Sequence, residues 1–322
     1  MKQSLIFFIL LLSLSSQSHA EKMRVAYASF GPALSPSWVT AEKGFWKKHG
    51  LDVELIYLGG GSRSVPALLS GSIEVFLGSD TAGYTANLQG ADLVKLGVAM
   101  NTTGYSVVTR PEIGTVADLK GKTLGIGRGR DLPYIHLSKL LRDNGFDPKD
   151  DVKWLALGGS DAGRLAMLKS GVIHGTVFPA TADLIAVRAG MKILKKLETP
   201  ALAGGIHSSS IFVQKNRDSL RRFLEGYIEG IHYMINHKDE SVIVFSKVLK
   251  NSDLNSVAHL YDEIGKRVQQ DLRPNPESVR FFIDLIAVDY PQAQRLSEKD
   301  YWDLSLLDEI QRSGFVQRLY RK

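Results

Sequence analysis

Short runs of β-branched or apolar residues alternate with amphipathic stretches along most of this chain, a pattern that predicts βαβ units around a mostly parallel sheet. The first series of these units extends to about residue 99. Its expected strands are 24–28, 53–57, 73–77 and 93–99, and its expected helices are 39–49, 62–69 and 81–89. The expected fold class is therefore α/β.

A second series of units follows, and long helical patterns come after it. The expected strands of this series are 123–127, 152–157, 175–178 and 192–194, separated by helices at 132–143, 162–169 and 180–189. From about Lys215 onward the pattern predicts helices without strands, at 219–236, 241–249, 257–269 and 276–286. The chain thus divides into two similar α/β segments and a helical C-terminal region.

The two α/β segments also resemble each other in sequence. Six residues of the first recur 100 positions later in the second (171 − 71 = 100), where Leu68, Ser70, Gly71, Ile73, Thr81 and Ala82 correspond to Leu168, Ser170, Gly171, Ile173, Thr181 and Ala182. Because their order is preserved, we favour a common architecture over a chance match. Two similar lobes imply a cleft between them, and open parallel sheets bind ligands at the carboxyl ends of their strands.

The first twenty residues have the pattern of a cleavable export signal. Lys2 supplies a positive charge, residues 5–12 form an apolar run, and residues 18–20 place small side chains at the two positions that a signal peptidase reads. A membrane anchor is the alternative, but it needs about 20 apolar residues, and serines interrupt this run from Ser13 onward. We expect residues 1–20 to be removed and a chain beginning at Glu21 to be exported to a periplasm.

Composition narrows the chemistry that this chain can perform. Its 322 residues are 44% hydrophobic and 23% charged, which is typical of a soluble protein of about two domains. The absence of cysteine excludes disulfides, thiolate metal sites, a cysteine nucleophile and a lipoprotein anchor. The histidines show no metal-ligand spacing, and the net charge of +6 permits an anionic ligand without requiring one. We expect no metal, no cofactor and no nucleic-acid partner.

The motifs of the common enzyme classes are missing from the sequence. The segment Gly125–Arg130 superficially resembles a dinucleotide-binding loop, but Arg130 stands where the third glycine is needed. The chain has no nucleophile elbow, no Walker loop and no HExxH motif. These observations favour binding over catalysis.

Two segments resemble a known family. Residues 41–54 (AEKGFWKKHGLDVE) and 118–122 (DLKGK) are similar to the exported substrate-binding proteins of nitrate/sulfonate/taurine-type ABC importers, which include the NMT1/THI5-like proteins. Weaker similarity extends over nearly all of the chain that follows the signal. The resemblance implies a two-lobed type II periplasmic binding fold, in which the chain crosses between the lobes twice and the lobes close on a ligand.

On that template the two crossings fall near Met100–Ser106 and Ala203–Ser210. One lobe would then contain 21–102 and 208–322, with the C-terminal helices packed on it, and the other would contain 103–207. The implied protein is a monomer that captures a small polar, anionic organic molecule such as a sulfonate or carboxylate. It would deliver that molecule to an ABC permease in the inner membrane. The alternatives are a ligand-binding partner of a sensor and a pyrimidine-precursor-processing protein of the same fold.

The loops of the first lobe contain three groups of candidate ligand-binding residues. Ser35 and Ser37, beside Trp38, can either cap the first helix or donate hydrogen bonds to a ligand oxygen. Gly60 and Ser62 belong to a glycine-rich loop that enters a helix. Such a loop either exposes backbone N–H groups to an anion or is only a tight turn.

The third group, Ser79, Asp80 and Thr81, follows the third strand of the first lobe. Asp80 has two possible roles at this position. It is either a helix cap, or a cleft residue that favours a ligand with an amine or another N–H donor.

In the second lobe, Arg128 and Arg130 precede a helix and suit a carboxylate, sulfonate or phosphonate, unless they point outward into solvent. The resembled family usually has small and hydroxyl-bearing residues at this point, so the two arginines depart from its pattern. Asp161 is a candidate, although its position favours a helix cap over a ligand contact. Phe178 lies where the family often presents an aromatic wall, and His207 falls in the expected second crossing.

Overall fold

A computed structural model describes residues 20–78, 80–127, 132–157, 161–287, 290–295 and 301–321. Three of the candidate ligand-binding residues, Ser79, Arg128 and Arg130, lie outside these ranges, as do the first 19 residues of the expected export signal. Their predicted roles therefore stay predictions.

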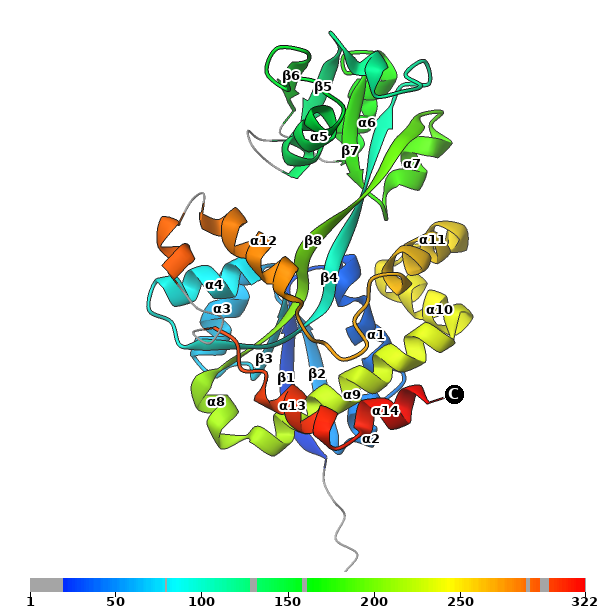
Figure 1. Cartoon of the computed structure of the whole chain (residues 1–322). Helices are drawn as coiled ribbons and strands as arrows, with labels where there is room; N and C mark the ends of the chain where they lie inside the picture. The colour runs from blue at the N-terminus through cyan, green and yellow to red at the C-terminus, as the bar shows by residue number, and fades with distance from the viewer. Residues whose placement is uncertain are drawn as a thin grey trace, which may run out of the picture.

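Within the described residues one sheet of eight strands runs through the whole molecule, in the order β2-β1-β3-β8-β4-β7-β5-β6. The strands are β1 (Glu21–Tyr27), β2 (Leu51–Tyr57), β3 (Val75–Gly78), β4 (Leu93–Thr109), β5 (Thr123–Ile126), β6 (Lys153–Ala156), β7 (Gly175–Pro179) and β8 (Lys192–Ser209). Figure 1 shows two lobes, with β1 to β3 in one and β5 to β7 in the other. The predicted α/β fold with two lobes is confirmed.

The internal sequence repeat corresponds to a structural one. In the first lobe β1 pairs in parallel with β2 and β3, and in the second lobe β5 pairs in parallel with β6 and β7. The intervening helices of the first lobe are α1 (Ser35–Glu42), α2 (Phe45–Lys48), α3 (Gly61–Leu69) and α4 (Asp80–Leu88). Those of the second lobe are α5 (Leu132–Asp143), α6 (Asp161–Ser170) and α7 (Asp183–Arg188). Both lobes therefore direct their strand-to-helix loops towards a shared cleft.

Two long antiparallel strands, β4 and β8, connect the lobes (Figure 1). β4 has 17 residues and β8 has 18, so the predictions that the corresponding strands end at residues 99 and 194 are wrong. Small, polar and apolar residues are mixed along the central parts of both strands, for example Thr103 and Gly104 of β4, so these parts lack a regular apolar alternation that would reveal a strand. The strands also make the sheet mixed, because β8 runs antiparallel to β3 and β4 runs antiparallel to β7.

The lobe boundaries after residues 102 and 207 stay a prediction. β4 is continuous through residues 100–106, where the first crossing is expected. At the second expected crossing, Ile206 and His207 pair with Leu77 and Phe76 of β3, and both are fully buried. His207 thus lies beside a strand of the first lobe rather than between the lobes.

The C-terminal third of the chain packs helices on the first lobe. They are α8 (Ser210–Lys215), α9 (Arg217–Asn236), α10 (Lys238–Leu249), α11 (Leu254–Gly265), α12 (Pro276–Ala287), α13 (Ser305–Arg312) and α14 (Phe315–Tyr320). α9 lies across α1 and α2, and Gly230 allows this close approach, since a Cβ there would come within 2.0 Å of Oγ1 of Thr40. Each lobe has its own core, around Phe223 in the first and Leu141 in the second.

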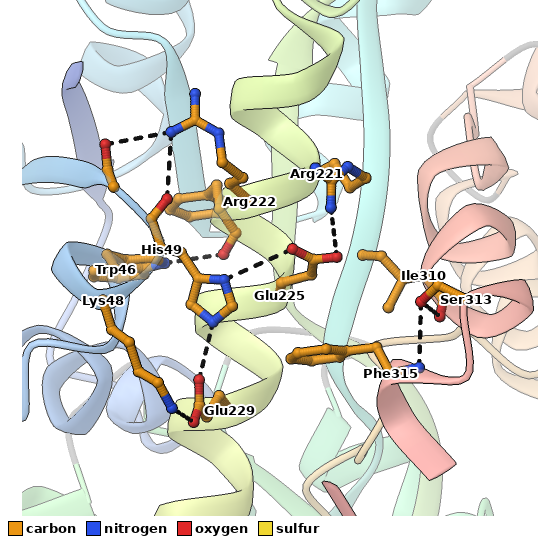
Figure 2. Close-up of polar contacts among 12 residues, drawn as sticks. Trp46, Lys48, His49, Arg221, Arg222, Glu225, Glu229, Ile310, Ser313 and Phe315 are labelled. Atoms are coloured by element: carbon orange, nitrogen blue, oxygen red, sulfur yellow. Dashed lines mark hydrogen bonds and ion pairs between the residues drawn. The ribbon is translucent and has the colours of Figure 1, made fainter. Parts of the chain in front are cut away.

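An ionic cluster holds α2 against α9 at the end of the first lobe away from the cleft. Figure 2 shows the His49 ring between Glu225 and Glu229, with Nδ1 3.7 Å from one carboxylate and Nε2 2.9 Å from the other. Arg221 and Lys48 pair with the outer sides of the same two carboxylates. Hydrogen bonding to Glu225 outweighs burial and raises the pKa of His49, so the imidazolium form is favoured.

The pH dependence of stability tests this cluster. Replacing His49 with glutamine is expected to lower the free energy of unfolding by about 1–2 kcal/mol at pH 5.5, because charge-assisted hydrogen bonds are lost. The contribution of a group whose folded pKa is raised is complete below its unfolded pKa and disappears as pH rises through the folded value. Urea unfolding of both proteins at pH 5.5 and pH 9 would show the difference shrinking. An equal difference at both pH values would contradict the assignment.

Candidate ligand-binding cleft

A cavity of about 820 Å³ lies between the two lobes, beside the β4–β8 pair. Its walls come from the loops after β1, β2, β3 and β7, from the central residues of β4 and β8, and from α11 and α12. Thr81 and Thr181, which occupy equivalent positions of the internal repeat, both line it. The cavity is therefore where the two similar lobes present the carboxyl ends of their parallel strands, as the sequence predicts.

Four of the predicted residues line this cavity, namely Gly60, Asp80, Thr81 and Asp161. Gly60 has a φ of 108°, a conformation that favours glycine, and it turns the chain from β2 into α3. Asp161 begins α6 and pairs with Arg164 on the same helix. Asp80 begins α4 and is almost completely buried, with 2% of its surface exposed.

The other predicted residues of the first lobe that the structure describes do not line the cavity. Ser35 and Ser37 are fully buried, and their hydroxyls donate to the carbonyl oxygens of Pro32 and Leu34 at 2.7 and 2.6 Å. Trp38 packs edge-on against Phe245 in the core. Ser62 is the second residue of α3 and also lies off the cavity lining.

Phe178 and His207 are buried instead of facing the cavity. The Phe178 ring lies beneath the Arg164 guanidinium, whose carbon is 5.6 Å from the ring centroid, and the following residues Pro179 and Ala180 form the wall. The period of two along β7 explains this result, because neighbouring residues of a strand point to opposite faces.

His207 belongs to a buried polar cluster behind the cavity wall. The cluster contains Asp80, Lys95 and Tyr301, and Asp80 forms an ion pair with Lys95. The Tyr301 hydroxyl lies 3.0 Å from Nδ1 of His207, and Nε2 of His207 lies 3.8 Å from Oδ1 of Asp80. Burial lowers the pKa of Lys95 well below its usual value, and burial together with Lys95 does the same to the pKa of His207.

Asp80 therefore has a role that neither sequence hypothesis included, as the partner of a buried lysine. Its second carboxylate oxygen, Oδ2, has no hydrogen-bond partner in the part of the chain that the structure describes. Asp80 belongs to the cavity lining, but both of its carboxylate oxygens are buried, so in this structure the carboxylate serves the buried cluster rather than the cavity.

Arg267, which the sequence analysis did not single out, also lines the cavity. It follows α11 and forms ion pairs with Glu198 of β8 and Glu263 of α11. A Cβ on Gly104 would lie 2.2 Å from one of its guanidinium nitrogens, so the arginine packs directly on the backbone of β4. A sequence argument based on strand-to-helix loops cannot find this residue, because only the packing of the C-terminal helices brings it to the cleft.

Tyr105 and Thr199 form a neutral part of the wall, on β4 and β8. The His136 ring lies behind them, 4.5 Å from the Tyr105 ring centroid and 3.2 Å from the Thr199 hydroxyl. Burial lowers the pKa of His136 to about 4, so this ring is neutral at neutral pH.

Most of the described lining is apolar or glycine. The charged side chains among the described lining residues are Asp80, Asp161, Glu263 and Arg267, and each has an ion-pair partner within the protein. Within the same ranges no group of three or more His, Cys, Asp or Glu side chains could hold a metal ion. No helix of the described ranges is both long and apolar enough to cross a membrane.

The chain was compared with known families. The family model described as NMT1/THI5 like matches residues 32–241, which is 210 of the 322 residues (241 − 32 + 1 = 210). The chain belongs to the NMT1/THI5-like family. The resemblance seen in the sequence is therefore confirmed.

Relatives and solved structures of this NMT1/THI5-like protein agree with that assignment. YtlA of Bacillus subtilis (strain 168), which carries the name of a binding protein, is 29% identical over 153 residues. The match covers 46% of each chain, so it spans about half the length of that relative. The periplasmic aliphatic sulphonate binding protein SsuA from Escherichia coli superposes with a TM-score of 0.63 at 19% identity, over 86% of this chain and 94% of its own.

A DSZB mutant in complex with biphenyl-2-sulfinic acid superposes with a TM-score of 0.69 at 12% identity, over 91% of this chain and 99% of its own. At these identities the structural likeness establishes the fold alone. It confirms the predicted two-lobed periplasmic binding fold.

Proposed function

We propose that this protein is a periplasmic solute-binding protein that captures a small organic molecule in the interlobe cleft and delivers it to an ABC permease. The observation that carries the proposal is the 820 Å³ cavity, whose walls come from two lobes that β4 and β8 connect. A volume of this size suits a small organic ligand. The proposal includes export through cleavage after residue 20 and a monomeric state without a lipid anchor.

We further propose that the ligand carries an anionic group. Arg267 is the basic side chain among the described lining residues, where it also pairs with Glu198 and Glu263. The structural likeness to a sulphonate-binding protein supports such a group. Arg128 and Arg130, which the sequence analysis proposes for the same task, lie outside the described residues. The three acidic lining residues argue against a ligand that is anionic throughout, because like charges repel in a partly dry cleft.

Binding is favoured over catalysis by the chemistry of the hydroxyl groups in the cleft. Thr199 and His136 approach each other as a nucleophile and a base would. A ring whose pKa is about 4 is a weak base at neutral pH, however, and no carboxylate is hydrogen-bonded to it among the described contacts. Turnover of a bound ligand, measured by mass spectrometry, would favour the enzymatic alternative instead.

Closure of the lobes provides the direct test of the proposed function. We expect a ligand, identified by thermal shift among sulfonates, carboxylates, phosphonates and pyrimidines, to decrease the radius of gyration in small-angle X-ray scattering. The physical reason is that a ligand contacting both lobes is bound more tightly by the closed state and shifts the population towards it. A compound that produces no thermal shift serves as the control. An unchanged radius at saturating ligand would contradict closure.

A further inference from the structure

Helix α12 presents an apolar stripe, formed by Phe281 and Leu285, to the cavity. The charged groups of the cleft do not account for this stripe. Phe281 and Leu285 lie four residues apart, hence on one face of the helix, and both line the cavity. Leu285 is 37% exposed, which places apolar surface of this helix against open space. Figure 1 shows α12 and α11 on opposite sides of the β4–β8 pair, so this stripe and Arg267 belong to different walls.

Residues adjoining this stripe anchor α12 to the body of the first lobe. Phe282 and Ile286 are buried in a cluster with Tyr84 and Tyr301, and the Phe282 and Tyr84 rings meet edge to face at 5.6 Å. Phe282 also belongs to the cavity lining and precedes Leu285 by three residues, so the anchor and the stripe adjoin on the helix surface. Phe281 and Leu285 are not members of the buried cluster, and they extend its apolar surface into the cavity.

The beginning of α12 is fixed to the strand that crosses the cleft. Asn101 of β4 accepts a hydrogen bond from the backbone N–H of Asn275 at 2.9 Å and donates one to the carbonyl oxygen of Arg273 at 2.6 Å. The hydroxyl of Ser278 donates to the Asn101 carbonyl oxygen. These bonds hold the apolar stripe at a set position relative to the centre of the cavity, as a preformed binding surface requires.

We infer that the ligand carries an aromatic ring or a similarly bulky apolar group that lies against Phe281 and Leu285. This inference rests on the proposed solute-binding function and names its ligand class, an organic anion with a large apolar body. Leu202, on β8, continues the same apolar wall. An inorganic anion or a one-carbon sulfonate would leave this stripe and most of the 820 Å³ without contacts.

Binding measurements with paired probes test the inference. The probes are 2-naphthalenesulfonate against methanesulfonate, and 2-naphthoate against acetate, each titrated into the full chain by isothermal titration calorimetry. The members of each pair share the charged group and differ only in the apolar body. We expect the naphthyl member to bind about 10- to 100-fold more tightly, because its ring is removed from water against α12.

Two serine variants distinguish ligand contact with the stripe from a general effect of exposed apolar residues. Leu285→Ser is expected to reduce the preference for the naphthyl probe about five- to tenfold and to leave the weaker probe nearly unchanged. Ile243→Ser is the matched control, because Ile243 is a 62% exposed residue of α10 outside the cavity lining. Neither substitution changes the charge of the protein, so the electrostatic potential at the anionic group of each probe stays the same.

The possible results distinguish this inference from the proposed function. Equal affinities within a pair, or an unchanged preference in Leu285→Ser, would overturn the apolar subsite while leaving solute binding intact. An equal loss of affinity for both probes in Leu285→Ser would indicate that the stripe contributes to lobe closure rather than to ligand contact. This result would also overturn the inference. The absence of binding by every probe, together with no thermal shift in the wider panel, would count against the proposed function itself.

Discussion

Replacing Lys95 with methionine is expected to lower the free energy of unfolding by about 3–5 kcal/mol, which is the usual effect of removing one partner from a buried ion pair. The Lys95 side chain is fully buried between Asp80 and the Trp302 ring, whose centroid is 4.2 Å from Nζ. The Asp80 side chain is only 1% exposed, so it cannot recover its lost partner from solvent. Urea denaturation at pH 7 provides the measurement.

A double variant identifies the cause of this loss. Combining Lys95→Met with Asp80→Asn removes both charges and is expected to recover most of the stability, since an uncompensated carboxylate is what makes the single variant unstable. A single variant less than about 1 kcal/mol below wild type would contradict the buried pair. A double variant that is no more stable than Lys95→Met would instead attribute the loss to packing.

Replacing Arg267 with methionine is expected to weaken the binding of an anionic ligand about thirtyfold to several-thousandfold. Truncation of a charged group in a closed, partly dry site costs about 2–5 kcal/mol of binding free energy. The variant also removes the cationic partner of Glu198 and of the lining residue Glu263. The affinity is measured by calorimetry with the sulfonate or carboxylate that gives the largest thermal shift.

Three comparisons make the Arg267 result specific. Arg312→Met removes the same charge from α13, outside the cavity lining, and is expected to bind within about threefold of wild type. Glu198→Gln frees Arg267 from an exposed partner and is expected to tighten binding up to about fivefold. The unliganded Arg267 variant must melt near wild type. If Arg267→Met binds the ligand within threefold of wild type, the anionic contact would instead be assigned to Arg128 or Arg130.

Polar contacts join α7 of the second lobe to α11, the helix that precedes Arg267. The His259 ring of α11 lies 2.9 Å from the Asp183 carboxylate of α7, and Arg188 pairs with Asp253 at the N-terminus of α11. The Ser106 hydroxyl donates to Asp183 at 2.6 Å. Helix α11 thus contacts the second lobe directly and carries Arg267 to the cleft beside the connecting strands.

The candidate site shows where sequence reasoning reaches its limit. Gly60, Asp80, Thr81 and Asp161 were identified because strand-to-helix loops of parallel sheets gather at one edge. Ser35 and Ser37 satisfy the same loop criterion but donate to carbonyl oxygens of the preceding turn. A single sequence does not say towards which side of a short helix a hydroxyl points.

The sequence by itself determined the family, because residues 41–54 and 118–122 resemble its members. It also predicted the two similar α/β lobes and the positions of most of the longer helices, which depend on periodicities that neighbouring residues establish. The tertiary structure decided that β4 and β8 continue through the cleft. The central residues of each strand pair with residues of the other that lie almost 100 positions away in the sequence. It also decided that Asp80 partners Lys95 and that Arg267 and Leu285 line the cavity. These contacts join distant parts of the chain, and no local pattern of residues encodes them.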